Sequence, residues 1–194
     1  MTRTGRRAGS ADTRGQILDA ARHVFGEHGF ENASVRMVAG RAGVDPALVH
    51  HYFGTKQALF LTAMELPIDF NAVVDRVLSG PRGEIGARLV RQTLELWEEP
   101  ATRSLLMGIV RSATTDAVAA GMLRRLLSQG PVLALTRASG NPDAALRATL
   151  AGSQIVGLAM ARYVIGVEPL ASASKEEVVR AVGPTVQRYL VGRL

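Results

Sequence analysis

Cysteine is absent from the sequence of 194 residues. Its absence excludes disulfide bonds, thiolate metal sites and cysteine nucleophiles, and it fits a reducing compartment. The sequence also shows no apolar run of the roughly 18 residues that a membrane span needs. The arginines within residues 1–14 are not followed by the apolar segment of a secretory signal. We therefore expect a cytoplasmic protein that has no membrane partner.

Catalytic motifs are missing too. The sequence has no G-x-S-x-G, H-E-x-x-H, Walker A or Rossmann motif. Ser153 has a glycine on one side only and lies in a segment that is predicted to be helical. The carboxylates of Glu95, Glu98 and Glu99 are typical of a solvated helix face. The sequence therefore predicts no enzyme activity and no cofactor.

Acidic residues are outnumbered by basic residues, and the net charge is +6. Such a balance favours polyanionic partners. Four arginines and one aspartate fall within residues 1–14, among glycine, serine and threonine. We expect residues 1–11 to form a disordered basic arm. The arm either only solubilises the protein or follows a phosphate backbone and enters a minor groove.

Hydrophobic residues make up 47% of the chain, which is enough for a packed core. Their spacing by three and four residues is helical, and strand signals are scarce, so the fold class is predicted to be all-α. Helices are expected at residues 12–28, 35–42, 46–53 and 56–66, which form an amino-terminal domain of residues 12–66. Residues 67–194 are expected to form a second helical domain, with Pro67 as the hinge between the two.

Two short helices joined by a turn at Gly43 are the elements of a helix-turn-helix. The first helix supports the second, and the second projects into the major groove of DNA. In the second helix Val49 and Phe53 are four residues apart, so both should face the core. Ala47 and His50 should then face outward, together with His51.

Residues 34–59, SVRMVAGRAGVDPALVHHYFGTKQAL, resemble the DNA-binding domain of the TetR (tetracycline-repressor) family. The resemblance extends over about residues 12–66, and the rest of the chain is similar in length and helical character. It implies a ligand-responsive transcriptional regulator, most often a repressor, that binds a palindromic operator as a homodimer and is released by a small-molecule effector. The residues that carry it are Ala20-Ala21, Phe25, Gly29-Phe30, Val38-Ala39, Ala42-Gly43-Val44, Tyr52-Phe53, Lys56 and Ala58-Leu59.

Two positions depart from the family pattern. Leu48 stands where a threonine is common, and His50 stands where a tyrosine is common. A leucine can contact a thymine methyl group but forms no hydrogen bond, so the operator of a relative does not transfer to this chain. A helical small-molecule-binding protein without DNA-binding function is the alternative, and the complete motif with its basic residues argues against it.

Eight residues are predicted to contact DNA. Lys56 lies in the first turn of a helix, where the helix dipole disfavours a cation, so a phosphate bound at this helix end would explain its presence. The same argument applies to Arg36. A metal site at His50 and His51 is disfavoured, because neighbours on a helix point about 100° apart. The predicted set is Arg36, Pro46, Ala47, Leu48, His50, His51, Tyr52 and Lys56.

The segment from Pro142 to about Ile165 is apolar nearly all round, so it must be covered on more than one face. A second copy of the chain is the expected cover, with the last two helices of each copy forming a four-helix bundle. The last helix opens with a capping box at Ser174. The predicted interface consists of Ala148, Gly152, Val156, Ala159, Val178, Val182, Val186 and Tyr189.

The resemblance also implies an effector pocket between helices of the second domain. Its candidate lining mixes aromatic and methionine side chains with two polar contacts, although the same residues also suit an ordinary core. The candidates are Trp97, Met107, Arg111, Met122, Gln154, Met160 and Tyr163.

Overall fold

The computed structural model describes residues 9–65 and 68–194. Helices account for nearly all of the regular structure in these ranges, and no strand occurs in them, as predicted. Residues 1–8 of the expected arm and the expected hinge at Pro67 lie outside the described residues.

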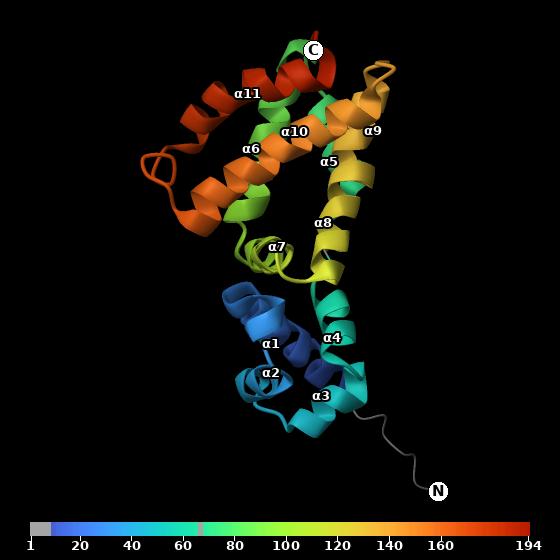
Figure 1. Cartoon of the computed structure of the whole chain (residues 1–194), viewed down its shortest axis with the longest axis vertical. Coiled ribbons are helices and arrows are strands. Elements are labelled where there is room, and N and C mark those ends of the chain that lie inside the picture. Colours follow the sequence, from blue (N-terminus) through green and yellow to red (C-terminus); the bar gives the residue numbers. More distant parts are fainter. Residues whose placement is uncertain (1–8, 66–67) are drawn as a thin grey trace, which may run out of the picture.

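The molecule is elongated, with its two domains stacked along the long axis (Figure 1). The amino-terminal domain comprises α1 (Gly9–Asn32), α2 (Val35–Ala42), α3 (Pro46–Phe53) and α4 (Lys56–Ala63). The carboxy-terminal domain begins after the undescribed residues 66–67. Its elements are α5 (Phe70–Leu78), a short 3-10 helix (Arg82–Glu84), α6 (Ile85–Glu98), α7 (Pro100–Ser112), α8 (Ala117–Gln129), α9 (Pro131–Ala138), α10 (Ala144–Ala159), a π-helical extension (Met160–Ile165) and α11 (Lys175–Val191).

Side-chain caps fix the starts of the three short helices. The hydroxyl of Ser34 accepts a hydrogen bond from the Met37 amide at 3.2 Å, and the carboxylate of Asp45 accepts one from the Ala47 amide at 2.7 Å. The Thr55 hydroxyl caps α4 in the same way. These caps satisfy amides that have no partner inside the helix.

Three helix boundaries differ from the prediction. The first helix begins at Gly9, so residues 9–11 belong to α1 rather than to the arm, and Asp12 lies in its first turn. The fourth ends at Ala63 rather than near Leu66. The tenth begins at Ala144 with Asp143 as its N-cap residue, two residues later than the expected first turn at Pro142. Each helix extends or stops according to its packing, which the cap signals alone do not reveal.

Gly29 breaks the regular geometry near the end of α1. Its φ of 72° and ψ of 175° are non-helical, and a side chain there would be strained at this φ. The break turns the amide of Phe30 away from α1, and this amide donates to the Ser112 hydroxyl of α7 at 2.8 Å. The helix end that the sequence predicts at Gly29 is therefore a sharp bend. The hydrogen bond that follows the bend links the two domains.

Each domain has its own core. In the amino-terminal domain, Phe25, Phe30 and Phe60 form a cluster of stacked and edge-to-face rings. In the carboxy-terminal domain, α6 and α11 cross so closely that a Cβ at Gly86 would overlap the backbone of Gly183 and Gln187. The first core also includes Leu105, Ile109 and Ala119 of α7 and α8, so the two domains share packing where α1 meets α7.

One stretch, Ala144–Ile165, is long and apolar enough to cross a membrane by length and composition, which corrects the expectation that the sequence has no such run. It packs against α6, α8, α9 and α11 of the same chain. It also carries Arg147, which is 6% exposed. Its hydropathy is therefore that of a core helix in a helical domain.

Candidate nucleic-acid interface and internal cavity

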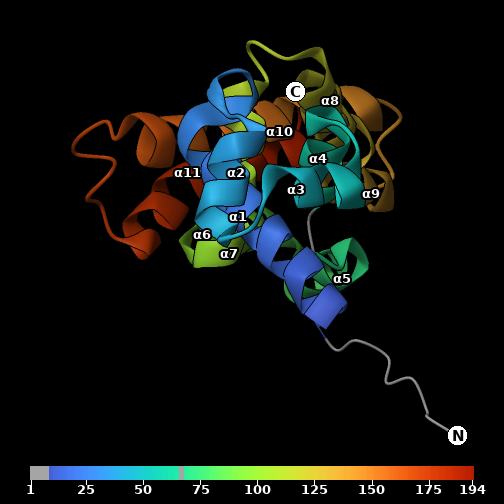
Figure 2. The same cartoon turned by 90° about the horizontal axis from the view of Figure 1, so that it is seen from below.

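Helix α3 lies at the end of the molecule opposite to α10 and α11 (Figures 1 and 2). Val49 is 1% exposed and anchors α3 in the core, as predicted. The side chains of Ala47, His50 and His51 are exposed, and those of Pro46, Leu48 and Tyr52 are half-buried. One face of α3, which carries Ala47, His50 and His51, is therefore open to solvent.

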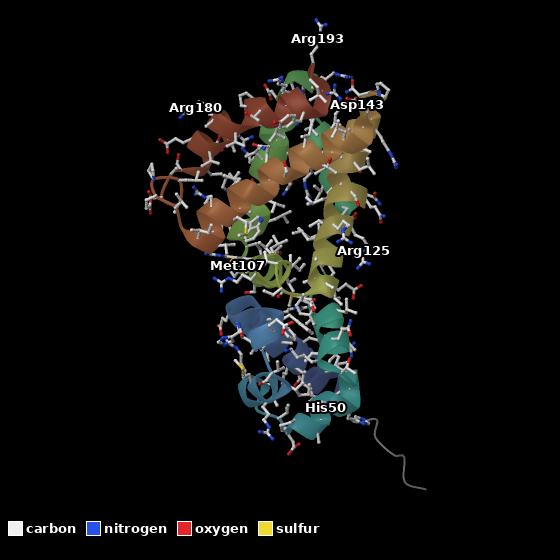
Figure 3. The ribbon with its side chains drawn as sticks, viewed as in Figure 1. His50, Met107, Arg125, Asp143, Arg180 and Arg193 are labelled. Atoms are coloured by element: carbon white, nitrogen blue, oxygen red, sulfur yellow. The ribbon has the colours of Figure 1, made fainter. Side chains whose placement is uncertain are left out.

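His50 lies at this tip (Figure 3). Its Nδ1 is 2.8 Å from the carbonyl oxygen of Gly54, the residue that follows α3. A carbonyl accepts hydrogen bonds only, so this contact assigns the hydrogen of the neutral ring to Nδ1 and leaves Nε2 as an acceptor. His51 instead packs edge-on against Tyr52. Within residues 9–65 and 68–194, no group of three His, Cys, Asp or Glu side chains is placed to hold a metal ion.

Lys56 has a partner inside the chain. Its Nζ donates to the carbonyl of Glu31 at 3.2 Å and lies 4.5 Å from the centre of the Phe30 ring. Glu31 follows the break at Gly29, so this contact joins the start of α4 to the segment that follows the regular turns of α1. Lys56 therefore has a structural role besides any contact with phosphate.

Two arginines add positive charge near the exposed face of α3. Arg36 is exposed in the first turn of α2, as predicted, and none of the described acidic residues pairs with it. Arg14 of α1 lies 5.2 Å from the centre of the Phe53 ring at the end of α3. The sequence does not predict this contact, because the contact depends on how segments far apart in the chain pack together.

A partly enclosed cavity of about 110 Å³ lies inside the carboxy-terminal domain, bounded by residues of α5 to α10. Its wall is aliphatic and aromatic, with Gln92, Thr93 and Trp97 as the polar side chains. A concave apolar site of this kind is the usual form of a small-molecule pocket.

Of the predicted effector residues, only Trp97 lines this cavity. Met107, Met160 and Tyr163 lie behind Trp97 in an adjoining cluster, where the Tyr163 ring stacks on the indole at 5.4 Å and 4°. Burial raises the pKa of the Tyr163 phenol above its usual value.

The other candidates have different surroundings. Met122 packs against the amino-terminal core, and Arg111 donates to the carbonyls of Gly26 and Glu27. Gln154 is absent from the wall of the cavity. These residues and the adjoining cluster therefore do not line this cavity, and their contact with an effector stays a prediction. Mainly aliphatic residues line the cavity, and the sequence does not distinguish them from residues of the hydrophobic core.

The predicted dimer stripe on α10 faces inward. Ala148 and Ala159 are 0% and 2% exposed within one chain, and Gly152 and Val156 line the cavity. A Cβ at Gly152 would lie 2.7 Å from Leu127 of α8. The small residues therefore admit a helix of the same chain, and this packing occupies the face of α10 that the sequence assigned to the dimer.

The predicted stripe on α11 is also largely internal. Val178 and Val186 are 3% and 0% exposed, and Val182 and Tyr189 are half-buried against the same core. The open side of α10 instead carries Leu146, Thr149, Ser153 and Gly157, and a Cβ at Gly157 would meet nothing within 4 Å.

Helix α7 belongs to both the cavity and the domain contact. Leu106, Ile109 and Val110 line the cavity, and Ile109 is also part of the amino-terminal core. At the end of α7, Arg111 donates to the carbonyl of Glu27 at 2.9 Å and Ser112 accepts from Phe30. Met107 marks this junction (Figure 3). A change in the cavity wall can therefore reach α1 through one helix.

The capped short helices, the left-handed turn at Gly43 and the exposed α3 define the class of helix-turn-helix DNA-binding proteins. Residues 17–63 match the family model described as bacterial regulatory proteins of the tetR family. Residues 83–190 match the model described as the tetracyclin repressor-like C-terminal domain. The chain belongs to the TetR family and is a transcriptional regulator.

Known relatives agree with this assignment. The chain is similar to the HTH-type transcriptional regulator BetI of Brucella anthropi, with 31% identity over 83% of this chain and 86% of that protein. It is also similar to BetI of Agrobacterium fabrum, with 32% identity over 84% and 82% of the two chains. A solved TetR-family regulator from Streptomyces coelicolor A3 has 38% identity, a TM-score of 0.62 and coverage of 96% of this chain and 99% of its own.

Proposed function

We propose that this regulator is a cytoplasmic repressor that binds a near-palindromic operator as a homodimer and leaves it when a small molecule enters the cavity. The observation that carries this proposal is the double role of α7, which lines the cavity with Ile109 and Val110 and contacts α1 through Arg111 and Ser112. The cavity and the DNA-binding domain thus share a structural element whose position a ligand can change.

On the DNA side, α3 enters the major groove, with Ala47 and Leu48 facing base edges and His50 near its end. Arg36 and Lys56 contact phosphates, and Arg14 adds a further positive charge. The support is the exposure of α3 together with the net charge of +6. Phosphate contacts position the protein, and contacts to base edges provide the specificity.

The homodimer forms through the open side of α10 and the outer side of α11. Leu146 is 56% exposed, and Ser153 and Gly157 on the same side are small enough for close helix approach. On α11 the outer positions are Ala181, Pro184 and Thr185. An exposed leucine beside small residues suits a helix–helix interface. This proposal uses the two helices that the sequence predicts for the dimer, but it uses the opposite face of α10.

Selection of duplexes from a random DNA pool tests this function. We expect an inverted repeat whose half-site centres lie about one helical turn or somewhat more apart, and binding that weakens steeply with salt. Recovery of one asymmetric half-site would contradict the dimer. Absence of salt-dependent duplex binding would favour a helical small-molecule-binding protein without DNA-binding function.

A further inference from the structure

Ionisable side chains are missing from the wall of the cavity. No Asp, Glu, Lys, Arg or His is among the described residues that line it. A charged ligand would therefore lose its hydration without gaining a counter-charge, which is strongly unfavourable in an apolar site. The wall selects for uncharged molecules.

The polar side chains in the wall are mostly engaged within the protein. Thr93 donates its hydroxyl hydrogen to the Leu89 carbonyl at 2.9 Å. The amide of Gln92 accepts from Arg76 at 2.8 Å and donates to Glu95 at 3.3 Å. Trp97 is the remaining polar side chain of the wall. The wall side chains therefore offer few unused hydrogen-bonding groups.

The size of the cavity limits the ligand further. Its volume is about 110 Å³, and an apolar cavity of about 150 Å³ stays dry and binds benzene, so a molecule of about one ring is the upper limit. Small aliphatic residues such as Gly152 and Ala159 form part of the wall, so a flat ring can lie against it.

We propose that the effector is an uncharged, mainly apolar molecule of about one ring that carries few hydrogen-bonding groups. This inference rests on the proposed role of the cavity as the effector site. The inference defines the ligand by its lack of charge and by its size. It also predicts that cations and anions of the same shape bind more weakly.

Trp97 provides a direct measurement, because it is the sole tryptophan of the chain and lies in the wall. The full-length protein is titrated at neutral pH with benzyl alcohol, benzylammonium and benzoate, and the tryptophan fluorescence is recorded. These probes share one ring and differ in charge. We expect a saturable change with benzyl alcohol, and at least tenfold weaker binding of both charged probes.

Variants at Thr93 and Ala159 locate the site. Thr93→Asp should prefer benzylammonium over benzyl alcohol. Ala159→Leu should fill the cavity and lose benzyl alcohol, whereas Gln129→Leu, on an exposed position of α8, should not. Thermal unfolding confirms that each variant is folded.

The outcomes separate this inference from the proposed function. Equal or tighter binding of benzylammonium or benzoate to the unchanged protein, or no binding of any probe, would overturn the inference. The fluorescence titration needs no DNA. If benzyl alcohol binds in the cavity but does not release DNA, the ligand class stands and the proposed control of DNA binding fails.

Discussion

The amide of Phe30 donates a hydrogen bond to the hydroxyl of Ser112 across the junction between the two domains, over 2.8 Å. Ser112 is fully buried, and its acceptor role depends on the bend at Gly29 that exposes the Phe30 amide. The end of α7 is therefore fixed to the end of α1 by a bond that water cannot easily replace.

Ser112→Ala leaves the Phe30 amide without its acceptor. We expect the free energy of unfolding to fall by about 1–3 kcal/mol, and a cavity ligand to change DNA affinity less than in the unchanged protein. Urea unfolding and DNA titration with and without ligand measure the two effects. Ser104→Ala serves as the control, because its hydroxyl donates within α7 to the Pro100 carbonyl. A loss of stability with unchanged ligand response would assign Ser112 to stability alone.

Arg36 and Lys56 should differ in their effects on salt dependence and stability. Arg36→Ala should make the slope of log affinity against log salt shallower by about 0.9, with stability unchanged, because its side chain is exposed. Lys56→Ala should also flatten the slope while leaving sequence preference intact. It should in addition lower the thermal midpoint, since Lys56 holds the Glu31 carbonyl. An unchanged slope in either variant removes that residue from the phosphate contacts.

His50 should contribute to operator affinity through its ring. Its Nδ1 is paired with the Gly54 carbonyl, so Nε2 is the ring atom left to accept a hydrogen bond from a partner. We expect His50→Ala to weaken operator binding, and fluorescence anisotropy on one operator measures the change. Unchanged affinity in His50→Ala would exclude His50 from the DNA contacts.

Ser153→Glu should disrupt the proposed dimer. Ser153 is on the open side of α10, so two copies would bring two carboxylates together in the interface. We expect monomers with weaker operator binding, because the half-sites are no longer linked. Sedimentation beside a DNA-binding assay gives both readouts, and Thr114→Glu at an exposed position outside α10 and α11 is the control.

Val156→Glu should behave differently, because Val156 lines the cavity. A carboxylate there is buried without a partner, so we expect loss of stability and not clean monomers. If Val156→Glu gave folded monomers and Ser153→Glu stayed dimeric, the interface would lie on the face that the small residues first suggested.

The amino-terminal domain was predictable because its signals are local. A cap such as Asp45, the turn glycine Gly43 and the four-residue spacing of Val49 and Phe53 each fix a structure within a few residues, and all agree with the structure. The exposed positions on α3 follow from that spacing. The contact of Arg14 with Phe53 was not predictable, because it depends on a crossing between distant segments.

The carboxy-terminal domain shows where local reasoning ends. A line of small residues on α10 indicates close helix packing, but it does not tell whether the partner is Leu127 of the same chain or a second copy. The cavity wall is equally hard to predict, because residue type alone does not distinguish Ile155 in the wall from an isoleucine in the core. Whether such residues line a cavity or fill a core depends on how α5 to α10 are placed relative to one another.

Ile109 belongs both to the cavity wall and to the core of the amino-terminal domain. A substitution that reshapes the cavity at Ile109 therefore also alters the stability of the domain that contacts DNA. Walls formed by α5 and α9 carry no such constraint, whereas Leu123 of α8 lines the cavity and also packs against the amino-terminal core. New ligand preferences can be engineered on those walls by a single change, whereas α7 requires compensating changes in both domains.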